Sequence, residues 1–267
     1  AEWIGAWGLT EHNTGSDAGG MATTAVKDGD HWVINGVKNF ITHAISGDIS
    51  VVIVRTGEKG DSHGMTAFVI EKGTPGFTSA NKLDKLGMRA SETAELIFDN
   101  CRVPHENILG EEGGGFAIAN DRLARQRVPY AAECLGVAIR AHEMAVEYSK
   151  IRETFGATLS SRQGIQWMLV ENEIDLRSAR LLVLDAAAKC DSGLPFRTES
   201  AIAKLVCAEN GFRVVDRSMQ IHGGLGVAKD LPLERWFREM RIRRIGEGPS
   251  EVQKHVIARD IIGASLR

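Results

Sequence analysis

The chain has 267 residues and a net charge of −3, with 43% hydrophobic and 25% charged residues. This mixture is that of a folded globular protein, and it excludes a disordered chain, a collagen and a coiled coil. The slightly negative charge argues against a nucleic-acid partner held by phosphate neutralisation. No apolar run is long enough for a membrane span, so we expect none.

The first hundred residues predict β structure. Short apolar or β-branched runs bounded by Gly, Asp or Lys predict strands at residues 33–34, 40–41, 50–54, 65–70 and 94–98. Asn35-Gly36 lies between the first two runs and is typical of a tight hairpin turn. Asp99-Asn100 is expected to end the last strand. Short strands at this spacing favour a sandwich or a barrel.

The second half changes to a helical period. Apolar residues recur every three or four positions from Ile165 to Ala186, which predicts one face of a long helix. Further helices are expected at 199–219, with Thr198 as N-cap, and from Pro249-Ser250 to Ile261. Long helices joined by short links favour a bundle. We therefore predict an α+β protein with a β domain at 1–112 and a helical domain at 113–267.

Two glycine-containing loops are candidate ligand sites. The polar segment 8–17 follows a strand and offers backbone N–H groups and hydroxyls to an anionic or flat polar ligand, although a surface turn has the same composition. In the segment 220–226, Gly223-Gly224 would let a phosphate approach the backbone closely. A helix C-cap explains the same two glycines.

Glu247 lies between two glycines just before a predicted helix. A carboxylate on such a loop suits a general base, and it equally suits an acid at the positive end of a helix. Four arginines at 238, 241, 243 and 244 precede it. They could meet phosphates, or they could form a solvated helix face paired with Glu234 and Glu239.

Other kinds of site lack their usual signatures. The four cysteines form no CxxC pair, and no HExxH spacing is present, so we expect no metal site. No GxSxG elbow indicates a hydrolase. Scattered cysteines fit a reducing compartment, for which we expect a bacterial cytoplasm or the mitochondrial matrix.

Six ordered motifs together resemble the acyl-CoA dehydrogenase family. They are GLTEHNTGSD at 8–17, VKNFITHA at 37–44, ELIFDNCRVPHENILGEEGGGF at 95–116, RETFGATLSSRQGIQ at 152–166, QIHGGLG at 220–226 and EGPSEVQ at 247–253. The resemblance implies the family's middle β domain, described above as sandwich-like or barrel-like, followed by its antiparallel four-helix bundle. The chain starts at Ala1 inside an apolar segment. We therefore expect the family's N-terminal helical domain to precede it in the natural protein.

The resemblance also implies which residues contact FAD. Those that match the family's cofactor contacts are Trp7, Leu9, Thr10, Ser16, Phe40, Ile41, Thr42, Arg152, Phe155, Gln163, Gln220, Gly223, Gly224, Glu251 and Gln253. In the family, the positions of Arg152, Phe155 and Gln163 reach the FAD of a neighbouring subunit, and Gln220, Gly223 and Gly224 match its diphosphate cradle. The resemblance therefore implies a homodimer or a homotetramer.

The implied reaction is the oxidation of an acyl-CoA thioester to the trans-2-enoyl-CoA, as in fatty acid β-oxidation. Glu247 matches the base that removes the α-proton while flavin accepts the β-hydride. The alternative base position on the helix of Arg127 is Gln126, which cannot serve. Ser16, Arg127 and Gly248 match substrate contacts, although the acid usual three residues before Arg127 is replaced by Ala124.

The implied electron acceptor is an electron-transferring flavoprotein. A flavin oxidase or monooxygenase of the same fold and a non-catalytic assembly module are the alternatives. Two positions depart from the common pattern, namely Gly246, where an aromatic residue is usual, and Pro249, where Thr or Ser is usual. We expect Gly246 to leave room for a branched, cyclic or substituted acyl group.

Overall fold

The computed structural model describes residues 2–58, 61 and 63–263. The chain divides into two compact units, residues 1–122 and 123–267, called here unit 1 and unit 2. The division lies inside a long helix, whereas the boundary expected from the sequence, 112/113, lies just before that helix. The predicted α+β class is confirmed, with a curled sheet in unit 1 and helices in unit 2.

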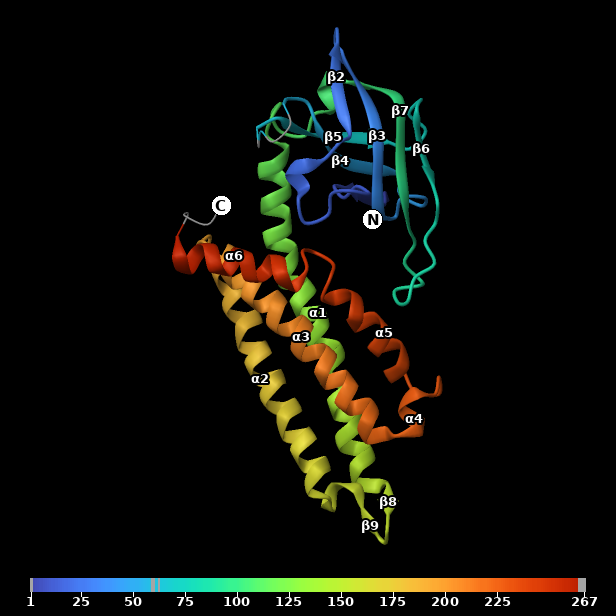
Figure 1. The fold of residues 1–267 in the computed structure, drawn as a ribbon, viewed down its shortest axis with the longest axis vertical. Helices are drawn as coiled ribbons and strands as arrows, with labels where there is room; N and C mark the ends of the chain where they lie inside the picture. The colour runs from blue at the N-terminus through green and yellow to red at the C-terminus, as the bar shows by residue number, and fades with distance from the viewer. Residues whose placement is uncertain (1, 59–60, 62, 264–267) are drawn as a thin grey trace. The chain divides into compact units, whose positions relative to one another are not determined.

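Unit 1 contains one seven-stranded sheet. Its strands are β1 (Gly5–Gly8), β2 (Thr24–Asp28), β3 (His31–Thr42), β4 (Ile49–Arg55), β5 (Met65–Glu71), β6 (Phe77–Ala80) and β7 (Thr93–Pro104). The strand order along the main path is β1-β4-β2-β3-β7-β6, and β5 pairs with β4 outside this path. Because β2 meets β4 only through the pair Thr24–Arg55, the sheet can bend there, and β4 and β5 run across β2, β3 and β7 (Figure 1). The core lies inside this bend and includes Trp32, Ile34, Val52, Phe68 and Leu96.

Two sequence-based turns are wrong. Asn35-Gly36 lies within the continuous strand β3, and the β2–β3 connection is at Gly29-Asp30. The register of β3 against β7 shifts between Ile34 and Gly36, where β7 carries an extra residue. Asp99-Asn100 belongs to that irregularity and does not end β7. Gly36 is needed there because a Cβ would lie 2.5 Å from Thr23 Oγ1, so the glycine marks a close approach between strands.

Unit 2 is a helical bundle. Its long helices are α1 (Gly115–Ile151, which begins in unit 1), α2 (Gln163–Asp191) and α3 (Arg197–His222), with shorter helices α4 (Gly224–Val227), α5 (Leu233–Arg243) and α6 (Ser250–Ile262). Strands β8 (Glu153–Thr154) and β9 (Ala157–Thr158) form a hairpin between α1 and α2. The shared core contains many alanines and other small residues, which let helices approach closely.

The helical periodicity located α2, α3 and α6 and missed α1 and α5. The predicted inner face of α2 is confirmed, since Asn172, Leu176, Ala179, Val183 and Ala186 are buried. Thr198 is not the N-cap of α3, because the helix already begins at Arg197 and its N-cap is Phe196. No helix within the described residues is long and apolar enough to cross a bilayer.

Candidate active site

In unit 1, the loop after β1 lies beside the end of β3. The Asn39 N–H donates a hydrogen bond to the Thr10 carbonyl oxygen at 2.8 Å. This bond places two predicted flavin contacts, Leu9 and Thr10, next to the second group of predicted contacts at residues 40–42. Segments separated by about thirty residues therefore lie side by side, and their contact with a shared ligand stays a prediction.

A β-bulge shapes the end of β3. Between Lys38 and Ile41, β3 uses three steps where β7 uses two, and Phe40 takes the left-handed φ of +58°. The extra residue reverses the alternation of side chains, so that Lys38 and Ile41 are both buried while Phe40 is 63% exposed. The bulge therefore presents an aromatic ring outward, with exposed Thr42 beside it. Because the Ile41 side chain is buried, only the backbone of this residue could contact a ligand.

A buried ion pair supports the loop from below. The Lys38 ammonium, fully buried, donates to Glu11 Oε1 at 2.7 Å and to the Leu9 carbonyl oxygen at 3.2 Å. The Glu11 carboxylate also accepts the N–H groups of Ala22 (2.6 Å) and Thr23 (3.0 Å). Burial lowers the pKa of Lys38 to about 8, against the raising effect of Glu11. Burial opposes ionisation of Glu11 too, but Lys38 and these hydrogen bonds hold its pKa below the usual value.

The remaining predicted contacts of unit 1 lie on the same part of the chain. Trp7, on β1, is half-buried, and the Arg122 guanidinium lies 4.6 Å from its ring centroid. Ser16 is exposed in the loop that continues from Thr10. Their contact with a cofactor stays a prediction.

In unit 2, Glu247 lies on the loop between α5 and α6. It adopts a left-handed φ of +55°, and Gly248 follows with +89°. Such a conformation costs about 1–3 kcal/mol for a residue with a side chain and is characteristic of functional sites. Phe40 and Phe155, two other predicted site residues, are also held in this region.

Three side chains from three helices hold this loop by its carbonyl groups. Arg127 Nε on α1 donates to the Glu247 carbonyl oxygen at 3.3 Å, and Lys204 Nζ on α3 donates to that of Gly248 at 2.8 Å. Gln253 Nε2 on α6 donates to both carbonyls, at 3.1 and 2.8 Å. The strained loop is therefore overdetermined by its surroundings, which is the requirement for a preorganised base.

Two of the side chains that hold this loop, Lys204 and Arg127, are buried cations. Lys204 is fully buried, and burial lowers its pKa to about 8. Burial, with a further contribution from Arg197, lowers the pKa of Arg127. The predicted roles of Arg127 toward substrate and of Gln253 toward cofactor stay predictions. The contacts within the chain give both residues a part in positioning the loop.

The space beside Gly246 differs from expectation. A Cβ atom at Gly246 would lie 2.9 Å from the Tyr130 hydroxyl oxygen. The place of the missing side chain is therefore occupied by an aromatic side chain from α1. The sequence interpretation of Gly246 did not take Tyr130 into account, and the size of the acyl group stays a prediction.

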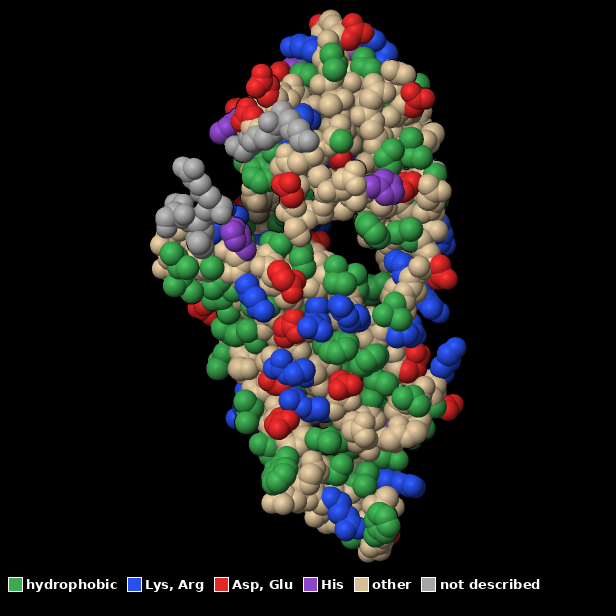
Figure 2. Space-filling model, in the orientation of Figure 1, with side chains coloured by type: hydrophobic (Ala, Val, Ile, Leu, Met, Phe, Trp, Pro, Cys, Tyr) green, Lys and Arg blue, Asp and Glu red, His purple; other side chains and the backbone are tan. Residues whose placement is uncertain are grey.

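Three of the four arginines before the Glu247 loop pair with carboxylates. Arg238 pairs with Glu234 at 2.9 Å, Arg244 with Glu209 at 2.8 Å, and Arg243 with Glu133. Figure 2 shows basic and acidic side chains interspersed over the helices of unit 2. These pairs favour the salt-bridged helix face over a phosphate site.

The other predicted residues of unit 2 gather where α1 and α3 both end. The rings of Tyr148 and His222 stack there with centroids 4.5 Å apart. Next to them in the chain lie exposed residues predicted to serve a neighbour's cofactor, namely Arg152, Phe155, Gln163, Gln220, Gly223 and Gly224. Lys204, which contacts the Glu247 loop, precedes His222 by 18 residues on α3, about 27 Å along the helix axis. Unit 2 thus carries two separate groups of predicted site residues, one around the Glu247 loop and one where α1 and α3 end. Glu251, in the first turn of α6, belongs to the group around the Glu247 loop.

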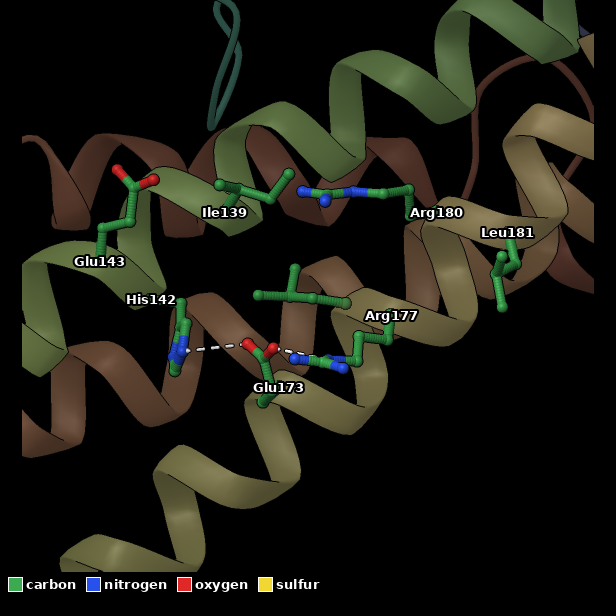
Figure 3. Close-up of a pocket in the computed structure, with 8 residues that line it drawn as sticks. Ile139, His142, Glu143, Glu173, Arg177, Arg180 and Leu181 are labelled. Atoms are coloured by element: carbon green, nitrogen blue, oxygen red, sulfur yellow. Dashed lines mark hydrogen bonds and ion pairs between the residues drawn. The ribbon is translucent and has the colours of Figure 1, made fainter.

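A cavity of about 480 Å³ lies between α1 and α2, away from both groups (Figure 3). Its charged wall includes Glu173, which lies 3.6 Å from His142 and 2.7 Å from Arg177. None of the predicted site residues lines it. Within the described residues, no cluster of His, Cys, Asp and Glu could hold a metal ion.

Sequence reasoning missed Glu11, Lys38, Lys204 and Tyr130. Lys38 has the same strand parity as buried Trp32 and Ile34, and Lys204 falls on the helical stripe that contains Ala201 and Cys207. Both lysines could have been recognised as polar groups on buried faces. No sequence signal relates Tyr130 to Gly246, more than a hundred residues away.

Comparison with known proteins adds independent evidence. Residues 6–101 match the family model of the acyl-CoA dehydrogenase middle domain, and residues 113–262 match that of the C-terminal domain. The rat mitochondrial short-chain specific acyl-CoA dehydrogenase is 44% identical over 255 residues, which are 96% of this chain and 62% of the relative. The chain therefore spans less than two thirds of that relative's length.

Solved structures agree. Butyryl-CoA dehydrogenase from Megasphaera elsdenii matches with a TM-score of 0.95 and 43% identity, over 98% of this chain and 68% of that one. A structure described as the FAD complex of PigA matches with a TM-score of 0.95 and 30% identity, over 97% and 68% of the two chains.

Proposed function

Because the chain belongs to the acyl-CoA dehydrogenase family, we propose that it catalyses FAD-dependent α,β-dehydrogenation of an acyl-CoA thioester to the trans-2-enoyl-CoA. The observation that carries this proposal is the base loop. Glu247 matches the family's base, and it is held at a left-handed φ while Arg127, Lys204 and Gln253 hold the backbone around it. Strain maintained by dedicated side chains is expected where a carboxylate must be positioned for proton transfer.

Glu247 takes the α-proton. This proton is too weakly acidic unless the thioester carbonyl oxygen accepts hydrogen bonds that stabilise the developing negative charge. We assign one of these to the backbone N–H of Glu247, whose orientation depends on the same clamped loop. Arg127 and Lys204 then act by keeping this backbone in place while the carboxylate moves a proton.

The surface of unit 1 suits a flavin ring. It combines an exposed aromatic side chain at Phe40 with the hydroxyl groups of Thr10 and Thr42, on a backbone fixed by a bulge and by the Lys38–Glu11 pair. FAD, when bound, supplies the acceptor for the hydride that leaves the β-carbon. The chain's own part is to provide a flat, rigid surface with hydrogen-bonding groups at its edge.

We propose that a second copy of the chain completes the cofactor site. Phe155 is 99% exposed at the tip of the β8–β9 hairpin, and Gly223 and Gly224 have open space where a Cβ would be. Exposed residues of this kind are suited to a neighbour's ligand, although the Arg162 guanidinium lies near the ring of Phe155. The outer side of α2 also carries an exposed apolar stripe, with the spacing of a helix–helix seam, at Trp167, Val170, Ile174, Leu181 and Leu184. A homodimer or a homotetramer would cover it.

The proposed electron acceptor is an electron-transferring flavoprotein, and the proposed location is a reducing compartment, a bacterial cytoplasm or the mitochondrial matrix. Free thiols at all four cysteines support the second proposal.

The test is anaerobic flavin reduction by a panel of acyl-CoA thioesters. The wild-type protein should bleach with at least one of them, and Glu247→Gln should slow bleaching by about 10²–10⁴-fold while FAD stays bound. Glu147→Gln, at an exposed position on α1, is the matched control and should bleach at the wild-type rate. Bleaching by Glu247→Gln at the wild-type rate would refute the base assignment. Rapid reoxidation by oxygen would indicate an oxidase or monooxygenase, and a protein without FAD an assembly module.

A further inference from the structure

Tyr130 fills the place of the side chain that residue 246 lacks. A Cβ built on Gly246 would lie 2.9 Å from the Tyr130 hydroxyl oxygen and 3.7 Å from the ring carbon that bears it. Gly246 is not among the glycines with positive φ, so its backbone would accept an alanine. The hydroxyl group, and not the backbone, is therefore what excludes a side chain at the position before Glu247.

The Tyr130 ring is fixed in this position. The Arg243 guanidinium lies 4.6 Å and Lys204 Nζ 5.8 Å from its centroid, both within cation–π range. Arg243 is itself paired with Glu133, and Lys204 holds the Gly248 carbonyl. Burial raises the pKa of Tyr130, with a smaller contribution of the same sign from Glu247, so the ring carries a neutral hydroxyl group.

We propose that Tyr130 is a specificity-determining residue, which forms the wall beside Glu247 and restricts the substrate to acyl thioesters without a substituent on the α-carbon. The inference rests on the proposed function. A base must come within about 2.6–3.2 Å, heavy atom to heavy atom, of the group whose proton it takes. The α-carbon therefore lies against Glu247, and we place a second substituent on that carbon beside residue 246, the adjacent position in the chain, where the Tyr130 hydroxyl group lies.

The first test measures substrate ranking in the FAD-bound protein. Wild type should have a higher kcat/KM for butyryl-CoA than for 2-methylbutyryl-CoA, which adds one methyl group at the α-carbon. Tyr130→Ala should lower this ratio by about tenfold or more, since one methyl group in a fitted pocket is worth about 10–200-fold. An unchanged ratio in an active Tyr130→Ala protein, or a wild type that prefers 2-methylbutyryl-CoA, would overturn the proposal. If no thioester reduces the wild-type flavin, the proposed function fails and this inference fails with it.

The second test concerns the contact itself and needs no activity. Gly246→Ala should lower the unfolding temperature by about 2–10 °C, because it overfills the space beside the hydroxyl group. In a Tyr130→Phe background the same change should have little effect, since the nearest ring carbon lies at an ordinary contact distance. Gly136→Ala, an exposed α1 position with nothing within 4 Å of its Cβ, is the control and should not lower the temperature. An equal loss in both backgrounds would refute the contact, and with it the assignment of Tyr130.

Discussion

The buried pair of Lys38 and Glu11 should be the main determinant of the conformation of the loop after β1, which we propose faces the flavin. Replacing one partner leaves a buried charge without its counter-charge, which typically costs about 3–5 kcal/mol. We expect Lys38→Met at the lower end, because the Glu11 carboxylate keeps two backbone N–H donors. Glu11→Gln should be at the upper end, because it leaves the Lys38 ammonium without a counter-charge and weakens those two hydrogen bonds as well.

The pair should be strongly coupled. In Lys38→Met/Glu11→Gln, the methionine side chain is apolar and the glutamine amide oxygen can still accept a backbone N–H group. The loss in the double variant should therefore be smaller than the sum of the single losses by about 2–3 kcal/mol. Thermal unfolding should show single losses of roughly 6–20 °C for a chain of this size.

The assay combines thermal unfolding with FAD titration of the refolded or purified apoprotein. Lys38→Met should bind FAD more weakly, because Lys38 holds the Leu9 carbonyl next to Thr10. Lys82→Met, at an exposed position, is the control and should change the free energy of unfolding by less than about 0.5 kcal/mol. Strictly additive losses, or a wild-type FAD affinity in Lys38→Met, would refute the role given to this pair.

Three further outcomes are expected. Between pH 8 and 10.5, Lys204 binds fewer protons in the folded state than in the unfolded state. The free energy of unfolding of wild type, relative to that of Lys204→Met, should therefore rise with pH across this window by at most about 3 kcal/mol. A falling or flat difference in calorimetry would contradict this. Phe155→Ser should weaken FAD binding in a titration without lowering the unfolding temperature, because this side chain is 99% exposed; an unchanged affinity would remove Phe155 from the cofactor site. Ile174→Lys, on the apolar stripe of α2, should shift light scattering toward a smaller species, whereas Lys150→Gln, an exposed control, should not; an unchanged mass would exclude the stripe as an interface.

The regular parts of the fold could be predicted because burial on one face produces a period. The inner face of α2 is the clearest case, since every third or fourth residue from Asn172 to Ala186 is buried. The helix α1 also has a buried stripe, from Ala131 to Ala145, but it consists mostly of alanine. Because alanine also occurs at exposed positions such as Ala132, the period is not visible in the sequence. The Asn35-Gly36 turn failed for a different reason. A glycine required by the approach of Thr23 has the same local signature as one required by a turn.

The candidate site could be predicted only where its residues are neighbours in sequence. Motif resemblance selected Glu247, Thr10 and Phe40 as candidates, but it did not reveal how the backbone around them is held. Those supports are long-range contacts of a lysine with a carbonyl group or a carboxylate, as between Lys204 and Gly248. A contact of this kind leaves no pattern in a single sequence beyond a charged residue on an otherwise buried face.

Both parts of the candidate site use a related device. In unit 1, the positive φ of Phe40 is imposed by a bulge above the buried Lys38, and in unit 2 that of Glu247 is imposed on a loop held by the buried Lys204. A lysine in these places holds a carbonyl group with a donor that water cannot easily replace, while its burial opposes the charged form. The arrangement costs folding free energy, as the lowered pKa of each lysine indicates. It fits a rigid backbone at Leu9 and Gly248, next to the proposed flavin contacts and the proposed base, because both proposed roles require fixed positions.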